Sequence, residues 1–131
     1  MPIRKSPVEL PAIAGIGLRS AQLPDVASRR PDIGWLEINA RSLMNDSTVA
    51  RTLESIRPDY PVALHDLGLS LSTRGRASPA HMAHLAATCA RFEPAMVSGV
   101  LSGGRGDRFQ RPDGITARRD DDAIKAVCEN I

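Results

Sequence analysis

Four polar side chains stand where short apolar runs of the sequence end, and their types are those that bind metals or transfer protons. They are Arg19, Glu37, Asn39 and His65. Imidazole and carboxylate groups are common ligands of transition metals, and an imidazole also acts as a general acid or base near neutral pH. His65 is the most informative, because it ends the apolar part of the stretch YPVALHDLGLSLST. We therefore treat His65 as a candidate metal ligand and the other three as candidate pocket-lining groups.

Strand geometry predicts that several of these side chains share one face of a sheet. Every second side chain of a strand lies on the same face. If Val62 and Leu64 pack under helices, His65 lies on the opposite face, and Glu37 and Asn39 lie on the corresponding face of the preceding run. A purely structural alternative stays open, in which the arginine and the glutamate form a salt bridge, the asparagine caps a loop and the histidine hydrogen-bonds a carbonyl.

The elements that would position these residues are short apolar runs alternating with amphipathic segments, a pattern typical of successive βα units. The runs cover residues 14–19, 34–39, 61–67 and 95–101. Helices are expected to begin near Pro24, at Asp46 or Ser47 after a polar loop, at Ser78–Pro79 and near Asp120. Strands separated by helices pair in parallel through right-handed crossovers. The predicted fold class is α/β, with a parallel sheet and about four βα units.

The third of these helices carries the clearest apolar stripe. Its residues at helical spacing are Met82, Leu85, Ala86, Cys89 and Phe92. His81 and His84, three residues apart on this helix, are spaced like a metal-binding pair. No carboxylate or cysteine stands at a matching spacing, so a solvated helix flank is the preferred interpretation.

Length and composition predict one domain over residues 1–131, with a mobile loop over residues 102–119, where the sequence shows no period. A complete eight-unit α/β barrel usually needs roughly 250 residues. The net charge of +2 does not favour nucleic acid as a partner. The sequence shows neither a signal peptide nor an apolar run long enough to cross a membrane, and the widely spaced Cys89 and Cys128 are interpreted as small core residues. We therefore expect a cytoplasmic protein.

The apolar runs resemble, in order, the N-terminal half of the multinuclear non-haem iron-dependent oxidative enzymes, a family of TIM barrels that includes the methanobactin- and bufferin-maturation enzymes. The similar segments are GIGLRSAQ, GWLEINARSLM, IRPDYPVALHDLGLSLS and SPAHMAHLAATCARFEPAMVS, which lie between residues 15 and 98. The resemblance implies a truncated, half TIM barrel. For the family it implies the oxidation of cysteine in a ribosomally made peptide by two or three irons and dioxygen, often with a partner protein that delivers the peptide.

Most of the family's metal-ligand positions hold other residues in this sequence. His65 matches a family histidine, and His81 matches a histidine that suggests packing or a hydrogen bond at the helix start. The positions that differ are Gln22 and Asn39 in place of histidines, Arg41 and Ser42 in place of Glu and Asn, Asp66 in place of glycine, and Gly99 and Val100 in place of Glu and His. Iron of this kind needs several histidine and carboxylate ligands for each ion.

The expected function is therefore that of a degenerate or truncated relative of these oxidases, without independent catalysis. Two alternatives stay open: an active iron-dependent oxidase completed by a second chain, and a module that binds a cysteine-containing peptide without chemistry. A half barrel leaves two edge strands and one sheet face open, so we also expect the chain to self-associate, to bind a complementary subunit or to fold only marginally.

Overall fold

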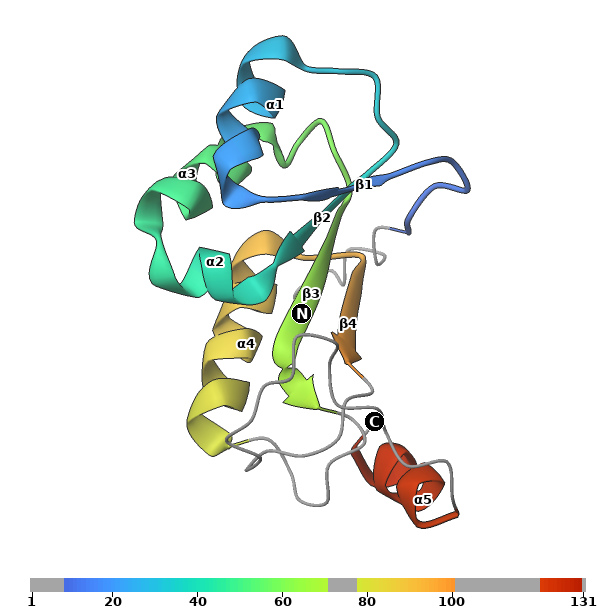
Figure 1. The fold of residues 1–131 in the computed structure, drawn as a ribbon. Coiled ribbons are helices and arrows are strands. Elements are labelled where there is room, and N and C mark those ends of the chain that lie inside the picture. The colour runs from blue at the N-terminus through green and yellow to red at the C-terminus, as the bar shows by residue number, and fades with distance from the viewer. Residues whose placement is uncertain (1–8, 71–77, 101–120, 131) are drawn as a thin grey trace, which may run out of the picture.

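The computed structural model describes residues 9–70, 78–100 and 121–130. Its four strands are β1 (Ile16–Leu18), β2 (Leu36–Asn39), β3 (Val62–Ser70) and β4 (Met96–Val100). They form one parallel sheet in the order β1-β2-β3-β4 (Figure 1). The predicted α/β class and parallel sheet are confirmed, and each strand lies beside the one that follows it, as in successive βα units. Within the described ranges the sheet does not close into a barrel.

The helices that follow the strands are short. They are η1 (Ser20–Gln22, one 3-10 turn), α1 (Leu23–Arg29), α2 (Ala40–Asn45), α3 (Ser47–Ile56), α4 (Pro79–Phe92) and α5 (Asp121–Asn130). Figure 1 shows α1, α2, α3 and α4 gathered on one side of the sheet. The opposite face of the sheet, which we call the inner face, is not covered by these four helices. The loop predicted over residues 102–119 lies outside the described residues.

The core lies between the sheet and this helix layer. Leu36 and Ile38 of β2 and Val62 and Leu64 of β3 point toward the helices, so the predicted alternation of faces is confirmed. Burial of each such aliphatic side chain contributes about 1.5–3 kcal/mol. The buried cluster also contains Leu18, Leu23, Val26, Leu43, Val49, Ala50, Leu53, Ile56, Tyr60 and Phe92.

Two helix starts were identified correctly from their capping residues. The Asp46 carboxylate accepts hydrogen bonds from the amides of Thr48 and Val49, at 2.8 and 3.2 Å, and so caps α3. The Ser78 hydroxyl accepts from the amide of His81 at 3.2 Å and caps α4. These caps satisfy amides that have no partner inside the helix.

The helix layer also corrects three sequence-based expectations. The polar loop expected after β2 is instead the helix α2, which is capped by Asn39. Met82 and Ala86 of the expected apolar stripe are exposed, because the buried line of α4 runs through Leu85, Thr88 and Phe92. Cys89 does pack against the core, whereas the other thiol, on α5, is exposed.

Arg57, directly after α3, ties that helix to the end of α4. Its Nε donates to the carbonyl of Phe92 at 2.6 Å, and its Nη2 donates to the carbonyl of Glu93 at 2.7 Å. The last carbonyls of a helix have no intrahelical partner, so a guanidinium with fixed, divergent donors satisfies two of them at once.

We expect Arg57→Ala to lower the free energy of unfolding by about 2 kcal/mol, because hydrogen bonds from a charged donor to partly buried carbonyls would be lost. Urea denaturation measures this change. Arg51→Ala, at an exposed position of α3, is the matched control and should change stability by less than about 0.5 kcal/mol. Equal losses in the two variants would contradict the role assigned to Arg57.

Candidate functional site on the inner face of the sheet

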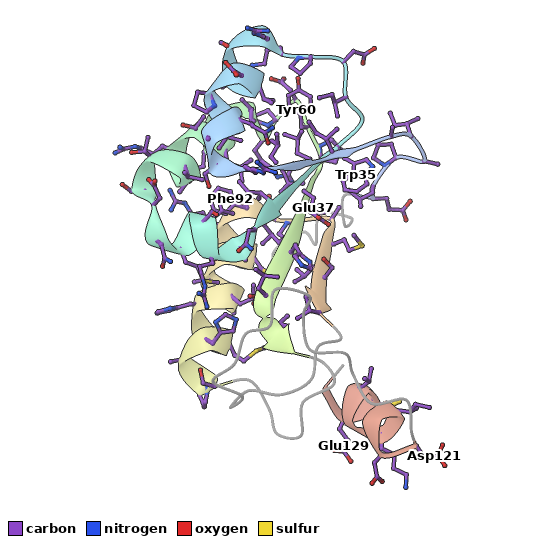
Figure 2. The ribbon with its side chains drawn as sticks, viewed as in Figure 1. Trp35, Glu37, Tyr60, Phe92, Asp121 and Glu129 are labelled. Atoms are coloured by element: carbon purple, nitrogen blue, oxygen red, sulfur yellow. The ribbon has the colours of Figure 1, made fainter. Side chains whose placement is uncertain are left out.

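Strand register brings the polar residues of the inner face into rows. Asn39 of β2 lies beside His65 of β3, which lies beside Ser98 of β4. Glu37 belongs to the preceding row, beside Ala63. Partners in register point to the same face of a parallel sheet, so all of these side chains project from the inner face. Figure 2 shows Glu37 on the side of the sheet away from the helices.

His65 is held by the neighbouring strand. Its Nδ1 lies 2.8 Å from the Ser98 hydroxyl oxygen, and that oxygen lies 3.5 Å from the carbonyl oxygen of Leu64. The structural alternative expected a carbonyl as the partner of His65, whereas the partner within the described residues is the hydroxyl of Ser98. Nδ1 is engaged, and among the described residues Nε2 has no hydrogen-bond partner, so Nε2 is the candidate nitrogen for a ligand. A histidine that bonds through one nitrogen and presents the other is the usual arrangement of a metal-binding or proton-transferring imidazole.

Asn39 has a structural task. Its Oδ1 accepts a hydrogen bond from the amide of Arg41 at 2.9 Å and caps α2. The alternative in which Asn39 has a capping role is therefore confirmed, although Asn39 caps a helix and not a loop. An amide oxygen engaged in this way is a poorer partner for a metal or a substrate than a free one.

Glu37 and Arg19 do not form the salt bridge that was considered as an alternative. Glu37 is half-buried on the inner face, and within the described part of the chain its carboxylate has no ion pair with Arg19. Arg19 is exposed just after β1, and its amide donates to Oε1 of Gln22 at 2.9 Å. The structure thus places Glu37, Asn39 and His65 on one face, whereas Arg19 lies at the start of the η1 turn.

An aromatic ring packs against β1 at the start of the inner face. Trp35 lies across Gly15, where a β-carbon would come within 2.2 Å of the indole, and its Nε1 donates to the carbonyl of Ile13 at 3.0 Å. Only glycine fits beneath the ring at this position. Trp35 precedes Glu37 and Asn39 at a spacing of two, so its ring lies on the same inner face as these polar side chains.

The donor set does not fit a multinuclear iron centre. Within residues 9–70, 78–100 and 121–130, no group of three or more histidine, cysteine, aspartate or glutamate side chains lies close enough to hold a metal ion. The inner face offers the imidazole of His65 and the carboxylate of Glu37, while Asn39 and Ser98 form hydrogen bonds within the chain. Non-haem iron sites use several imidazole and carboxylate ligands.

A second polar pair, which the sequence patterns did not reveal, lies on the helix side of the sheet. Asp66 is 1% exposed, and its Oδ2 lies 2.6 Å from Nε2 of His81 in the first turn of α4. Its Oδ1 accepts from the amide of Gly68 at 2.8 Å. A β-carbon at Gly68 would come within 2.5 Å of the His81 ring, so glycine is required there.

This pair engages His81, which was considered as a metal-binding partner of His84, so the interpretation as a solvated helix flank fits His84 but not His81. The ring of His81 turns toward the sheet and bonds Asp66, whereas His84 is exposed. A signal for the pair was present in the sequence, because Asp66 follows Val62 and Leu64 at a spacing of two and must share their helix-facing side. Burial and, to a smaller extent, the Asp66 carboxylate also raise the pKa of the Cys89 thiol, which disfavours the thiolate form.

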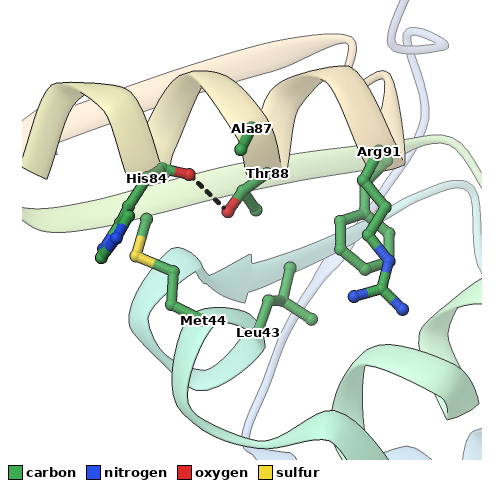
Figure 3. A pocket seen from close by; sticks show the side chains of 7 residues that line it. Leu43, Met44, His84, Ala87, Thr88 and Arg91 are labelled. Carbon is green, nitrogen blue, oxygen red and sulfur yellow. Dashed lines mark hydrogen bonds between the residues drawn. The ribbon is translucent and has the colours of Figure 1, made fainter.

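A cavity of about 250 Å³ opens between α2 and α4, on the outer side of the helix layer (Figure 3). Arg91 at its edge forms a salt bridge with Glu54 at 2.6 Å, which lowers the pKa of that carboxyl. The Thr88 hydroxyl donates to the carbonyl of His84 at 2.9 Å. The cavity is lined by Leu43, Met44, His84, Ala87, Thr88, Arg91 and Phe92. Arg91 is paired with Glu54, which does not line the cavity, and the Thr88 hydroxyl bonds a backbone carbonyl, so the inner face remains the better candidate site.

None of the described helices is long and apolar enough to span a lipid bilayer.

Comparison with known proteins agrees with the parallel βα architecture. Residues 13–131 match the family described as RiPP precursor modification enzyme MbnB/TglH/ChrH, where RiPP denotes a ribosomally made and post-translationally modified peptide. A UPF0276 protein of Chromobacterium violaceum is 32% identical over 93 residues, which cover 71% of this chain and 34% of the relative. A UPF0276 protein of Vibrio parahaemolyticus is 34% identical over 91 residues, which cover 69% of this chain and 32% of the relative.

A UPF0276 protein of Bordetella pertussis matches a longer part of the chain. It is 31% identical over 123 residues, which cover 93% of this chain and 43% of the relative. The chain thus spans between a third and a half of the length of these curated relatives. The family match covers most of the chain, including all four strands. The chain belongs to the MbnB/TglH/ChrH family of RiPP precursor modification enzymes.

Proposed function

We propose that this chain takes part in the modification of a ribosomally made peptide but does not by itself catalyse an iron-dependent oxidation. Membership of the family supports the peptide as the substrate class. The absence of independent catalysis is proposed mainly because of Asn39. This residue lies beside His65 in register, but its side chain caps α2. Oxidation of a cysteine in a precursor peptide is the activity that the resemblance implies for the family as a whole, and we do not assign it to this chain alone.

Three further positions support the proposal, because each side chain either has no atom that could bind a metal or uses that atom in a hydrogen bond within the chain. Gln22 accepts the amide of Arg19 with its side-chain oxygen. Gly99 and Val100 on β4 carry no donor atoms in their side chains. The resemblance places histidine or glutamate at these three positions. One imidazole and one carboxylate cannot complete the coordination that several iron ions require.

The experiment is iron loading under anaerobic conditions. The purified chain is incubated with Fe(II), desalted and analysed for metal by mass spectrometry, beside a full-length family member treated identically. We expect less than one equivalent of iron on this chain and more on the full-length protein. Retention of one or more tightly bound irons per chain would overturn the proposal.

An iron-dependent oxidase completed by a second chain is the second candidate. It is favoured by His65, whose Nδ1 is fixed by Ser98 so that Nε2 is left for a ligand, and by the half-buried Glu37 on the same face. In that case His65 and Glu37 would hold part of the metal site, and iron at this site would supply the oxidative chemistry. Iron that is retained only after a partner chain is added would distinguish this candidate from the first.

A peptide-binding module without chemistry is the third candidate. Met96, on the inner face of β4, is 42% exposed and is the type of adaptable apolar side chain that binding surfaces use. Capture of a cysteine-containing peptide that mass spectrometry then shows to be unmodified would favour this candidate. Absence of any captured peptide would count against it.

A further inference from the structure

Among the described residues, no further strand pairs with the outer edge of β1 or of β4. β1 reads IGL and β4 reads MVSGV, so neither strand contains a charged residue or a proline. Charges, prolines and covering loops are the devices by which natural edge strands avoid pairing with other chains. Apolar side chains are exposed at both edges on the helix side of the sheet, with Ile16 and Val97 each 39% exposed.

The backbone at both edges has hydrogen-bonding groups directed outward. In a parallel ladder alternate residues bond to the strand on one side and to the strand on the other. The amide of Ile16 donates to the carbonyl of Trp35, directly before β2, so Gly17 directs its amide and carbonyl away from β2. Ala95, just before β4, donates to Val62 of β3, so the next residue, Met96, directs its backbone groups away from β3. These groups are available to a further parallel strand.

We propose that two copies of this chain pair through these edges, β4 of each copy with β1 of the other, and close an eight-stranded parallel barrel. A two-fold axis parallel to the strands keeps all strands in the same direction, so both new contacts are parallel and identical. The four described strands of each copy, in the order β1-β2-β3-β4, together supply the eight strands that such a barrel contains. Closed two-fold dimers are also the commonest form of soluble oligomer.

Closure has a consequence for the inner face, which becomes the lining of the barrel. Each copy contributes His65 and Glu37 from the described inner face, so the dimer collects two imidazoles and two carboxylates where one copy has one of each. Met96, which is 42% exposed in the single chain, would become covered. The inference goes beyond the proposed function, because the dimer would exist whether or not it binds iron.

The test is the mass of the full chain in solution, measured by size-exclusion chromatography with light scattering over a range of concentrations. We expect a dimer that dissociates on dilution. Val97→Lys should weaken dimerisation by at least about a hundredfold. Each copy brings one lysine, so a charge would be buried at both of the new edge contacts of the dimer. Met82→Lys is the matched control, since Met82 is 44% exposed on α4, away from both edges, and it should leave the mass unchanged.

Circular dichroism of Val97→Lys should show that the single chain keeps its helices, since this position is exposed before pairing. A monomer at all concentrations, open-ended oligomers larger than a dimer, or equal effects of the two lysine substitutions would each overturn the proposal. Binding of a different chain in place of a second copy would also overturn it. Iron loading is measured separately, so failure of the dimer and failure of the proposed function give different results.

Discussion

His81→Ala should lower the free energy of unfolding by about 3 kcal/mol or more, the largest loss we expect from a single substitution in this chain. The Asp66 side chain is almost fully buried, and His81 supplies the partner of Oδ2 at 2.6 Å. Removal of the imidazole leaves that oxygen without its partner beneath α4, while the amide of Gly68 still bonds the other oxygen. A buried carboxylate that loses its partner bears most of its desolvation cost without compensation.

Urea denaturation of the purified variants measures this loss. His84→Ala removes an exposed imidazole one turn further along α4 and should change stability by less than about 0.5 kcal/mol. The variant Asp66→Ala with His81→Ala removes both groups, and a double-mutant cycle then gives the coupling between them. Additive losses in this cycle would show that the contact contributes nothing of its own.

The strands could be predicted because their signal is local. Leu36 and Ile38 alternate with Glu37 and Asn39, and a strand's period of two converts this pattern directly into a buried and an open face. The caps of α3 and α4 were equally readable, since a capping side chain bonds amides only two or three residues away. Fold class and strand order follow from these local signals together with the rules for parallel crossovers.

The contacts that decide the site are non-local, and the sequence did not reveal them. His65 meets Ser98, 33 positions later, only because the register of β3 and β4 places them side by side. Asp66 meets His81 only because α4 returns over the end of β3. Met82 on α4 is exposed because no neighbouring element covers that side of the helix within the described residues. The apolar character of Met82 alone does not reveal this exposure.

The short helix α2 was missed for a related reason. Six residues are too few for a clear apolar period, and an isolated helix of this length is not stable in water. It forms here because Asn39 caps its first turn and because Ala40 and Leu43 are buried. The same fact bears on the site, since the residue that starts this helix is the one that stands beside His65.

Asn39→His should convert the inner face into a binding site for a divalent metal. Neighbouring parallel strands lie about 5 Å apart, so an imidazole at position 39 would project beside that of His65 from the same face. With the carboxylate of Glu37 on the same strand, two imidazoles and one carboxylate would be available, a set that transition metals favour. We expect Zn(II) to bind at least about tenfold more tightly than to the parent chain, as titration calorimetry would show.

The same substitution should also lower the free energy of unfolding by about 1 kcal/mol in the absence of metal, because the cap of α2 is lost. Asn45→His, at the exposed end of α2, adds an imidazole without a partner and is the matched control. His65→Ala in the Asn39→His background should abolish the gain in zinc affinity. If zinc affinity rises equally in the control, the gain comes from any added surface histidine, and the register of β2 and β3 does not define a latent site. If it rises only at position 39, the inner face keeps the geometry of a metal site, and Asn39, in capping α2, occupies the place of a ligand.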